Sequence, residues 1–128
     1  MSEKPEIGSI GWVDLTVAEA PEIRNFYRDV VGWTATNLSM GDYDDFCLNQ
    51  PGDGKTVAGI CHARGGNADL PALWLMYIVV ADLDHSIDRC TALGGEVIAG
   101  PKSMGKARYC VIKDPAGAVA ALYQSGES

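Results

Sequence analysis

At 128 residues, of which 47% are hydrophobic and 21% charged, the chain has the size and composition of one globular domain. Its net charge of -7 argues against nucleic acid and anionic membranes as partners, because both are bound by clustered Lys and Arg side chains. No stretch has the pattern of a signal peptide or a membrane span, and the four cysteines lack zinc or disulfide spacing. We therefore expect a cytoplasmic protein with reduced thiols.

The first half of the chain starts with a predicted strand, GWVDLTV, at residues 11–17. Because successive side chains of a strand alternate, Trp12, Asp14 and Thr16 share one face of it. An amphipathic helix is predicted at residues 21–32 from apolar residues spaced three and four apart. Three further strands are expected after it, at residues 33–38, 45–48 and 57–62.

The second half follows the same order of elements. A strand is predicted within residues 73–81, and a helix at 82–95 is expected to begin at Asp82 or Asp84 and to end at one of the two glycines that close this range. Three strands follow, at residues 96–99, 107–112 and 119–124. The order βαβββ therefore occurs twice.

Residues 63 positions apart correspond between the halves. The matching pairs include Gly32 with Gly95, Cys47 with Cys110, Gly54 with Gly117, and Ala58 with Ala121. Gly54 and Gly117 each close a turn before a final strand, and the second turn reads Asp-Pro-Ala-Gly, as a type I turn prefers. We expect one domain over residues 1–128, with module one at about 8–62, a linker at 63–72 and module two at about 73–125.

Four segments carry a resemblance to a known family: WVDLTV, FYRDVVGW, YIVVADLDHSIDRCTALGGEV and VIKDPAGAVAALYQ. The sequence resembles the glyoxalase, bleomycin-resistance and extradiol-dioxygenase group, the vicinal oxygen chelate superfamily. The resemblance implies an α+β fold in which two tandem βαβββ modules form an open, barrel-like mixed sheet around a cavity. It also implies a homodimer and, in the enzymes of the family, four metal ligands on the first and last strands of the modules.

Carried onto this sequence, those ligand positions fall on residues without donor atoms: Trp12, Ala58, Leu75 and Ala121. Divalent cations need oxygen, nitrogen or sulfur donors, so we predict neither a metal centre nor another cofactor. A register shifted by two residues offers a displaced metal site, which keeps a metal-dependent lyase, isomerase or dioxygenase as an alternative. Its members are Asp14, His62, Tyr77 and Tyr123.

The face of the first strand that carries Asp14 is expected to line the cavity. By repeat and parity its companions are Thr56, Ala58, Ile60, His62, Leu75, Tyr77, Val79, Val119, Ala121 and Tyr123, whereas Cys61 alternates away from it. Such a wall, apolar and aromatic with a few polar groups, is typical of small-molecule sites. We predict that a small organic ligand, sequestered as a drug or toxin, contacts Trp12, Asp14, Thr16, His62, Tyr77 and Tyr123.

Two other interpretations stay open at this stage. One is a metal-free enzyme in which Asp14 and His62 act as acid and base. The other is an inert dimeric module whose barrel is filled by Trp12 and the tyrosines, with Asp14 in a salt bridge.

Overall fold

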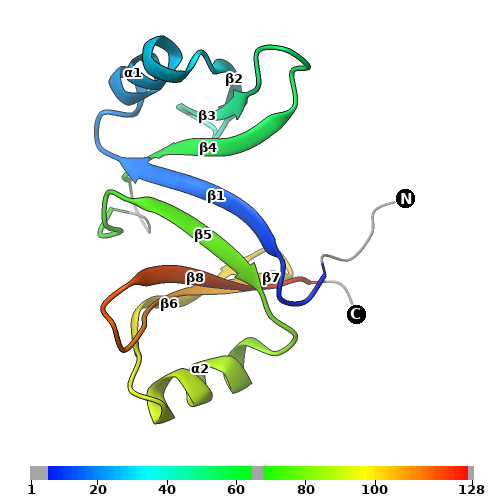
Figure 1. Ribbon diagram of the computed structural model, residues 1–128, viewed down its shortest axis with the longest axis vertical. Helices are drawn as coiled ribbons and strands as arrows, with labels where there is room; N and C mark the ends of the chain where they lie inside the picture. The colour runs from blue at the N-terminus through cyan, green and yellow to red at the C-terminus, as the bar shows by residue number, and fades with distance from the viewer. Residues whose placement is uncertain (1–5, 65–67, 127–128) are drawn as a thin grey trace. The chain divides into compact units, whose positions relative to one another are not determined.

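The structure is a computed structural model that describes residues 6–64 and 68–126 (Figure 1). The described elements are β1 (Ile10–Val17), α1 (Ala20–Val31), β2 (Thr34–Ser39), β3 (Asp44–Asn49), β4 (Thr56–His62), β5 (Trp74–Val79), α2 (Leu83–Ala92), β6 (Glu96–Met104), β7 (Ala107–Lys113) and β8 (Val119–Gln124). The strands follow the order β2-β3-β4-β1-β5-β8-β7-β6, so the predicted open mixed sheet with two helices is confirmed. Residues 65–67 of the predicted linker lie outside the described residues. No helix of the described part is long and apolar enough to cross a membrane.

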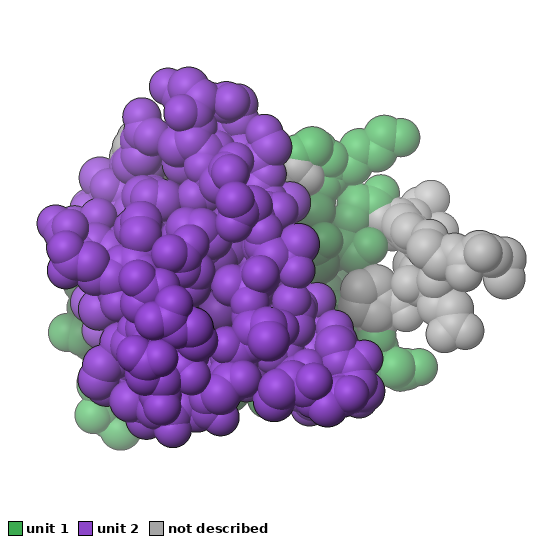
Figure 2. All heavy atoms as spheres, turned by 90° about the horizontal axis from the view of Figure 1, so that it is seen from above, with its two compact units in different colours: residues 1–12, 75–128 green, residues 13–74 purple. Residues whose placement is uncertain are grey.

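The chain divides into two compact units, which Figure 2 shows in different colours. Unit 1 holds residues 1–12 and 75–128, and unit 2 holds residues 13–74. The boundary falls inside β1, directly after Trp12.

Unit 2 has its core between α1 and one face of strands β1, β4 and β3. The buried members are Leu15, Ala20, Phe46, Leu48, Ala58 and Ile60. Leu15 lies opposite Ile60 in the parallel ladder of β1 and β4, and Ile60 lies opposite Phe46 in the next ladder. Helix α1 ends as predicted at Gly32, whose φ of 91° is left-handed and whose N–H donates to the carbonyls of Tyr27 and Arg28.

Unit 1 repeats this arrangement with α2 against one face of β5, β8, β7 and β6. Leu83, Cys110 and Leu122 are buried there, and Ile78 and Ile87 pack against them. The carboxylate of Asp82 accepts the N–H of His85 at 3.1 Å, so Asp82 is the N-cap. The left-handed glycine at the other end of α2 is Gly94, with φ of 96°.

The two halves do not correspond at a constant spacing of 63. Leu15 of β1 and Ile78 of β5 lie 63 residues apart. Their partners on the neighbouring strands, Ile60 of β4 and Leu122 of β8, lie 62 apart. The next partners along the sheet, Phe46 of β3 and Cys110 of β7, lie 64 apart. The hairpin before the last strand of each half accounts for the change from 64 to 62. Positions 46 and 60 are separated by 14 residues, whereas positions 110 and 122 are separated by 12.

Arg108 ties β7 to α2 through a bidentate ion pair. Its guanidinium donates to both carboxylate oxygens of Asp84, at 3.1 and 2.9 Å, and this hydrogen bonding, with the positive charge, lowers the pKa of Asp84. Because the folded pKa lies below the unfolded one, the pair stabilises the fold above the unfolded pKa, and its contribution is lost as pH falls through the folded pKa.

Arg108→Ala is therefore expected to cost more stability at about pH 7 than at about pH 2, because protonation of Asp84 at acidic pH weakens the ion pair. Urea unfolding of the wild type and the variant at both pH values measures the difference. An equal loss at the two pH values would contradict this role for the pair.

Candidate functional site

We call the face of β1 that carries Asp14 and Thr16 the polar face. It continues across β4 through residues that differ from those expected. Asp14 lies opposite Gly59 and Thr16 lies opposite Cys61, and residues paired in this way point to the same side of a sheet. Ala58 and Ile60 point to the other side, into the core beneath α1. His62 lies opposite Val17, which packs against the same core. The expectation that Ala58, Ile60 and His62 accompany Asp14 on one face, and that Cys61 alternates away from it, is therefore wrong.

The predicted contact residues are divided equally between the two units. Asp14, Thr16 and His62 belong to unit 2, where Thr16 is buried and His62 pairs with Val17 at the end of the β1–β4 ladder. The other three belong to unit 1: Trp12, Tyr77 and Tyr123. Trp12 is 36% exposed. That all six contact one ligand stays a prediction.

The donor atoms of the polar face in unit 2 do not fit the metal centre that the resemblance implies. Ala58 is enclosed in an apolar core, and its neighbour Gly59 on the polar face has no side chain. Burial, helped by the charges of Asp14 and Asp45, raises the pKa of the Cys61 thiol far above its ordinary value, whereas a metal needs the thiolate. Within residues 6–64 and 68–126, no three His, Cys, Asp or Glu side chains are placed to hold a metal ion.

An aromatic face lies in unit 1, on the side of the sheet opposite α2. Tyr77 lies opposite Ala121 in the ladder of β5 and β8, and Tyr123 lies opposite Tyr109 in the ladder of β8 and β7. Their sequence neighbours, among them Ile78 and Leu122, point the other way into the α2 core. We call Tyr77, Tyr109 and Tyr123 the tyrosine face.

The rings of the tyrosine face are held by the strands that carry them. The ring centroids of Tyr77 and Tyr109 are 5.8 Å apart at an interplanar angle of 56°. Tyr109 is buried, and Tyr77 and Tyr123 are half-buried. Because β-strand backbones fix the positions of these side chains, the aromatic surface is already ordered.

Asp45 is a candidate functional residue that the sequence analysis missed. The residue is 4% exposed, and one oxygen of its carboxylate accepts the backbone N–H of His62 at 2.9 Å and lies 3.2 Å from Nδ1 of the same residue. The signal available in the sequence was a carboxylate beginning the strand DFCL, where an apolar residue is the ordinary choice. Only the pairing of β3 with β4 shows that this carboxylate meets His62.

Comparison with known proteins agrees with the fold. A family profile described as Glyoxalase/Bleomycin resistance protein/Dioxygenase superfamily matches residues 9–122. The chain also resembles the methylmalonyl-CoA epimerase of Mycobacterium tuberculosis in structure, with a TM-score of 0.55, 19% sequence identity, and coverage of 97% of this chain and 92% of that one. At this identity the likeness shows the shared fold alone.

Two curated relatives are similar in sequence. The chain is 33% identical over 135 residues to the "Anthracycline biosynthesis protein DnrV" of Streptomyces peucetius, covering 93% of this chain and 48% of that protein. It is 32% identical over 135 residues to the "Anthracycline biosynthesis protein DauV" of Streptomyces sp. (strain C5), with the same coverage. The chain spans about half the length of these relatives. With most of its length matched by the family profile and its fold shared, the chain belongs to the Glyoxalase/Bleomycin resistance protein/Dioxygenase superfamily.

Proposed function

We propose that this protein binds a planar aromatic small molecule at the tyrosine face of unit 1. The observation that carries the proposal is the convergence of Tyr77, Tyr109 and Tyr123 on the side of the sheet that α2 does not cover. Phenol rings offer a large apolar surface, and their hydroxyl groups can pair with polar atoms at the rim of a ligand. Aromatic rings with a few polar groups are the usual lining of small-molecule sites.

The sequence relatives indicate which aromatic compounds to test. Both DnrV and DauV are named for anthracycline biosynthesis, and an anthracycline is a fused, planar and hydroxylated ring system. Such a molecule matches what a row of phenol rings recognises, because it offers flat apolar area and hydroxyl groups at its edge. We therefore take a fused-ring polyphenol as the ligand class.

Three further features belong to this proposal. The ligand also contacts Trp12, which belongs to unit 1 as the tyrosine face does. Binding needs no metal ion, because Trp12, Leu75 and Ala121 carry no metal-ligating atom and Ala58 points into the core of unit 2. The protein acts by sequestering the compound, as a homodimer.

Titration with doxorubicin, an anthracycline that fluoresces, tests the proposal. We expect saturable quenching of the drug with a dissociation constant in the micromolar range, in about 0.3 M salt to screen attraction of the cationic drug to this acidic chain. The same titration after dialysis against a chelator is expected to give an unchanged constant. The absence of saturable binding would overturn the proposed function, and its loss after chelation would overturn the metal-free part.

A further inference from the structure

A second group of side chains able to carry out chemistry lies in unit 2, at the end of β4. The buried carboxylate of Asp45 contacts His62 twice, through the backbone N–H at 2.9 Å and through the ring nitrogen Nδ1 at 3.2 Å. A carboxylate accepts hydrogen bonds and cannot donate one, so the ring hydrogen of a neutral His62 is on Nδ1. The lone pair of the imidazole is then on Nε2.

The imidazole is fixed in place and still reaches solvent. The ring of Tyr43 lies edge-on to it with centroids 5.3 Å apart, and the ring of Phe46 is 6.0 Å away. The side chain of His62 is 19% exposed, so its ring is packed on several sides without being sealed off. An imidazole ring held in this way presents its nitrogens to a ligand in one orientation.

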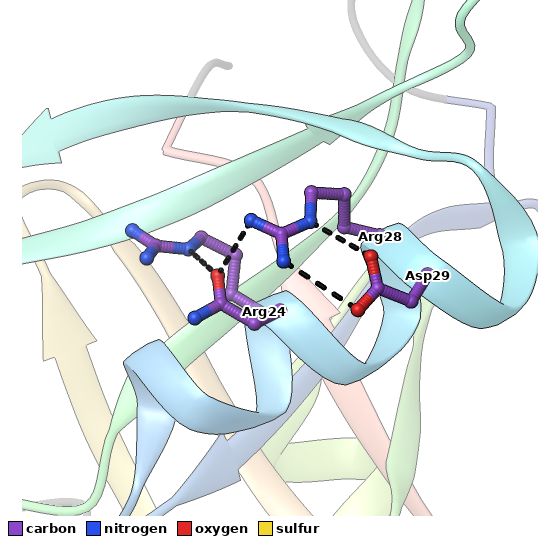
Figure 3. A network of polar contacts seen from close by, with 4 residues as sticks. Arg24, Arg28 and Asp29 are labelled. Carbon is purple, nitrogen blue, oxygen red and sulfur yellow. Dashed lines mark hydrogen bonds and ion pairs between the residues drawn. The ribbon is translucent and has the colours of Figure 1, made fainter.

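Two guanidinium groups stand over the rings that pack against His62. Arg64 lies 3.9 Å above the centroid of Tyr43 and also pairs with Asp42 at 3.8 Å. Arg24 lies 4.6 Å above the centroid of Phe46, and its Nε donates to the side chain of Asn25 at 3.1 Å (Figure 3). Positive charges of this kind favour a negative charge that develops nearby.

We propose that unit 2 holds a proton-transfer site in which Nε2 of His62 accepts a proton and Asp45 is the positioning residue. The substrate class is a neutral compound with an acidic O–H, or a C–H next to a carbonyl group. The O–H or C–H bond breaks, the proton moves to Nε2, and the electron pair stays on the compound as a phenolate or an enolate. The imidazolium that forms is paired with the carboxylate of Asp45. This site is independent of the tyrosine face.

Long-range proton–nitrogen NMR spectra of the labelled wild-type protein at about pH 8 test the tautomer directly. The chain has two histidines, so His85→Gln assigns the signals of His62. We expect hydrogen on Nδ1 and a bare Nε2. Hydrogen on Nε2, or on both nitrogens at this pH, would overturn the proposal.

Reaction with diethyl pyrocarbonate, which acylates a bare imidazole nitrogen, tests whether Nε2 can be reached and whether Asp45 positions it. In the His85→Gln background we expect one histidine to react, and at least about tenfold slower reaction after Asp45→Asn, since the amide can donate to Nδ1 and move the hydrogen to Nε2. No reaction at His62, or an unchanged rate in Asp45→Asn, would contradict the assignment. If Asp45→Asn does not fold, the tautomer of His62 in the wild-type protein and its rate of reaction with diethyl pyrocarbonate test the proposal.

Discussion

Ala58→Glu is expected to lower the free energy of unfolding by about 3–5 kcal/mol and to create no metal site. A glutamate at this position would restore the type of ligand that the family resemblance calls for. The side chain of Ala58, however, points into the core with Leu15 and Ile60 beneath α1, where the neighbours of a carboxylate are apolar. Urea unfolding gives the loss of stability, and elemental analysis of the purified variant gives its metal content.

The matched control is Ala35→Glu, which adds the same charge on the exposed strand β2 and is expected to change stability by less than about 0.5 kcal/mol. Because burial disfavours the charged form of a carboxyl group, the loss in Ala58→Glu should be smaller at about pH 5 than at about pH 8. If Ala58→Glu is as stable as Ala35→Glu, or binds stoichiometric metal, then Ala58 does not face the α1 core.

Tyr77→Ala is expected to weaken doxorubicin binding about tenfold, equivalent to about 1.4 kcal/mol. The substitution removes one half-buried ring of the tyrosine face and leaves the buried Tyr109 in place. Tyr77→Phe keeps the ring and should bind within about twofold of the wild type if stacking dominates. The titration described above measures all three proteins under the same conditions.

Tyr43→Ala is the control for this substitution, since Tyr43 is also half-buried but belongs to unit 2, whereas the tyrosine face belongs to unit 1. We expect its doxorubicin affinity to equal that of the wild type. Thermal unfolding of each variant shows whether a loss of binding reflects a loss of fold. Equal affinity in folded Tyr77→Ala and wild type would remove Tyr77 from the ligand site.

Most of the fold follows from local signals in the sequence. Apolar residues spaced three and four apart predict both helices, Gly32 ends the first at a left-handed residue, and Asp82 caps the second. The turn at Asp114 forms as its Asp-Pro-Ala-Gly sequence predicts, with the N–H of Gly117 donating to the carbonyl of Asp114 at 2.9 Å. These signals act within a few residues, so one sequence is enough to read them.

Register between strands was harder to predict, because the length of the intervening hairpin sets it. A constant spacing of 63 places Ala58 and Ala121 at equivalent positions, yet Ala58 lies in the α1 core and Ala121 lies opposite Tyr77 on the tyrosine face. A shift of one residue moves every side chain of a strand to the other face. The predicted cavity wall therefore has the wrong residues in β4, while its β5 residue Tyr77 and its β8 residue Tyr123 do share a face.

The pairing of Asp45 with His62 illustrates why part of the candidate site could not be predicted. The two residues are 17 positions apart, and they meet only because β3 and β4 form an antiparallel hairpin. Alternation in the sequence places Asp14 and His62 on one face and so predicts Asp14 as the acidic companion of His62. In the structure Asp45 contacts His62, and Asp14 lies opposite Gly59.

The most direct test of the proposed function is a map of amide chemical shifts in the labelled protein as doxorubicin is added. Binding at the tyrosine face predicts that the largest changes cluster in β5, β7 and β8, around Tyr77, Tyr109 and Tyr123, and that they saturate at the constant measured by fluorescence. Changes confined to α1 or α2, or shifts that grow linearly with drug concentration without saturating, would contradict it.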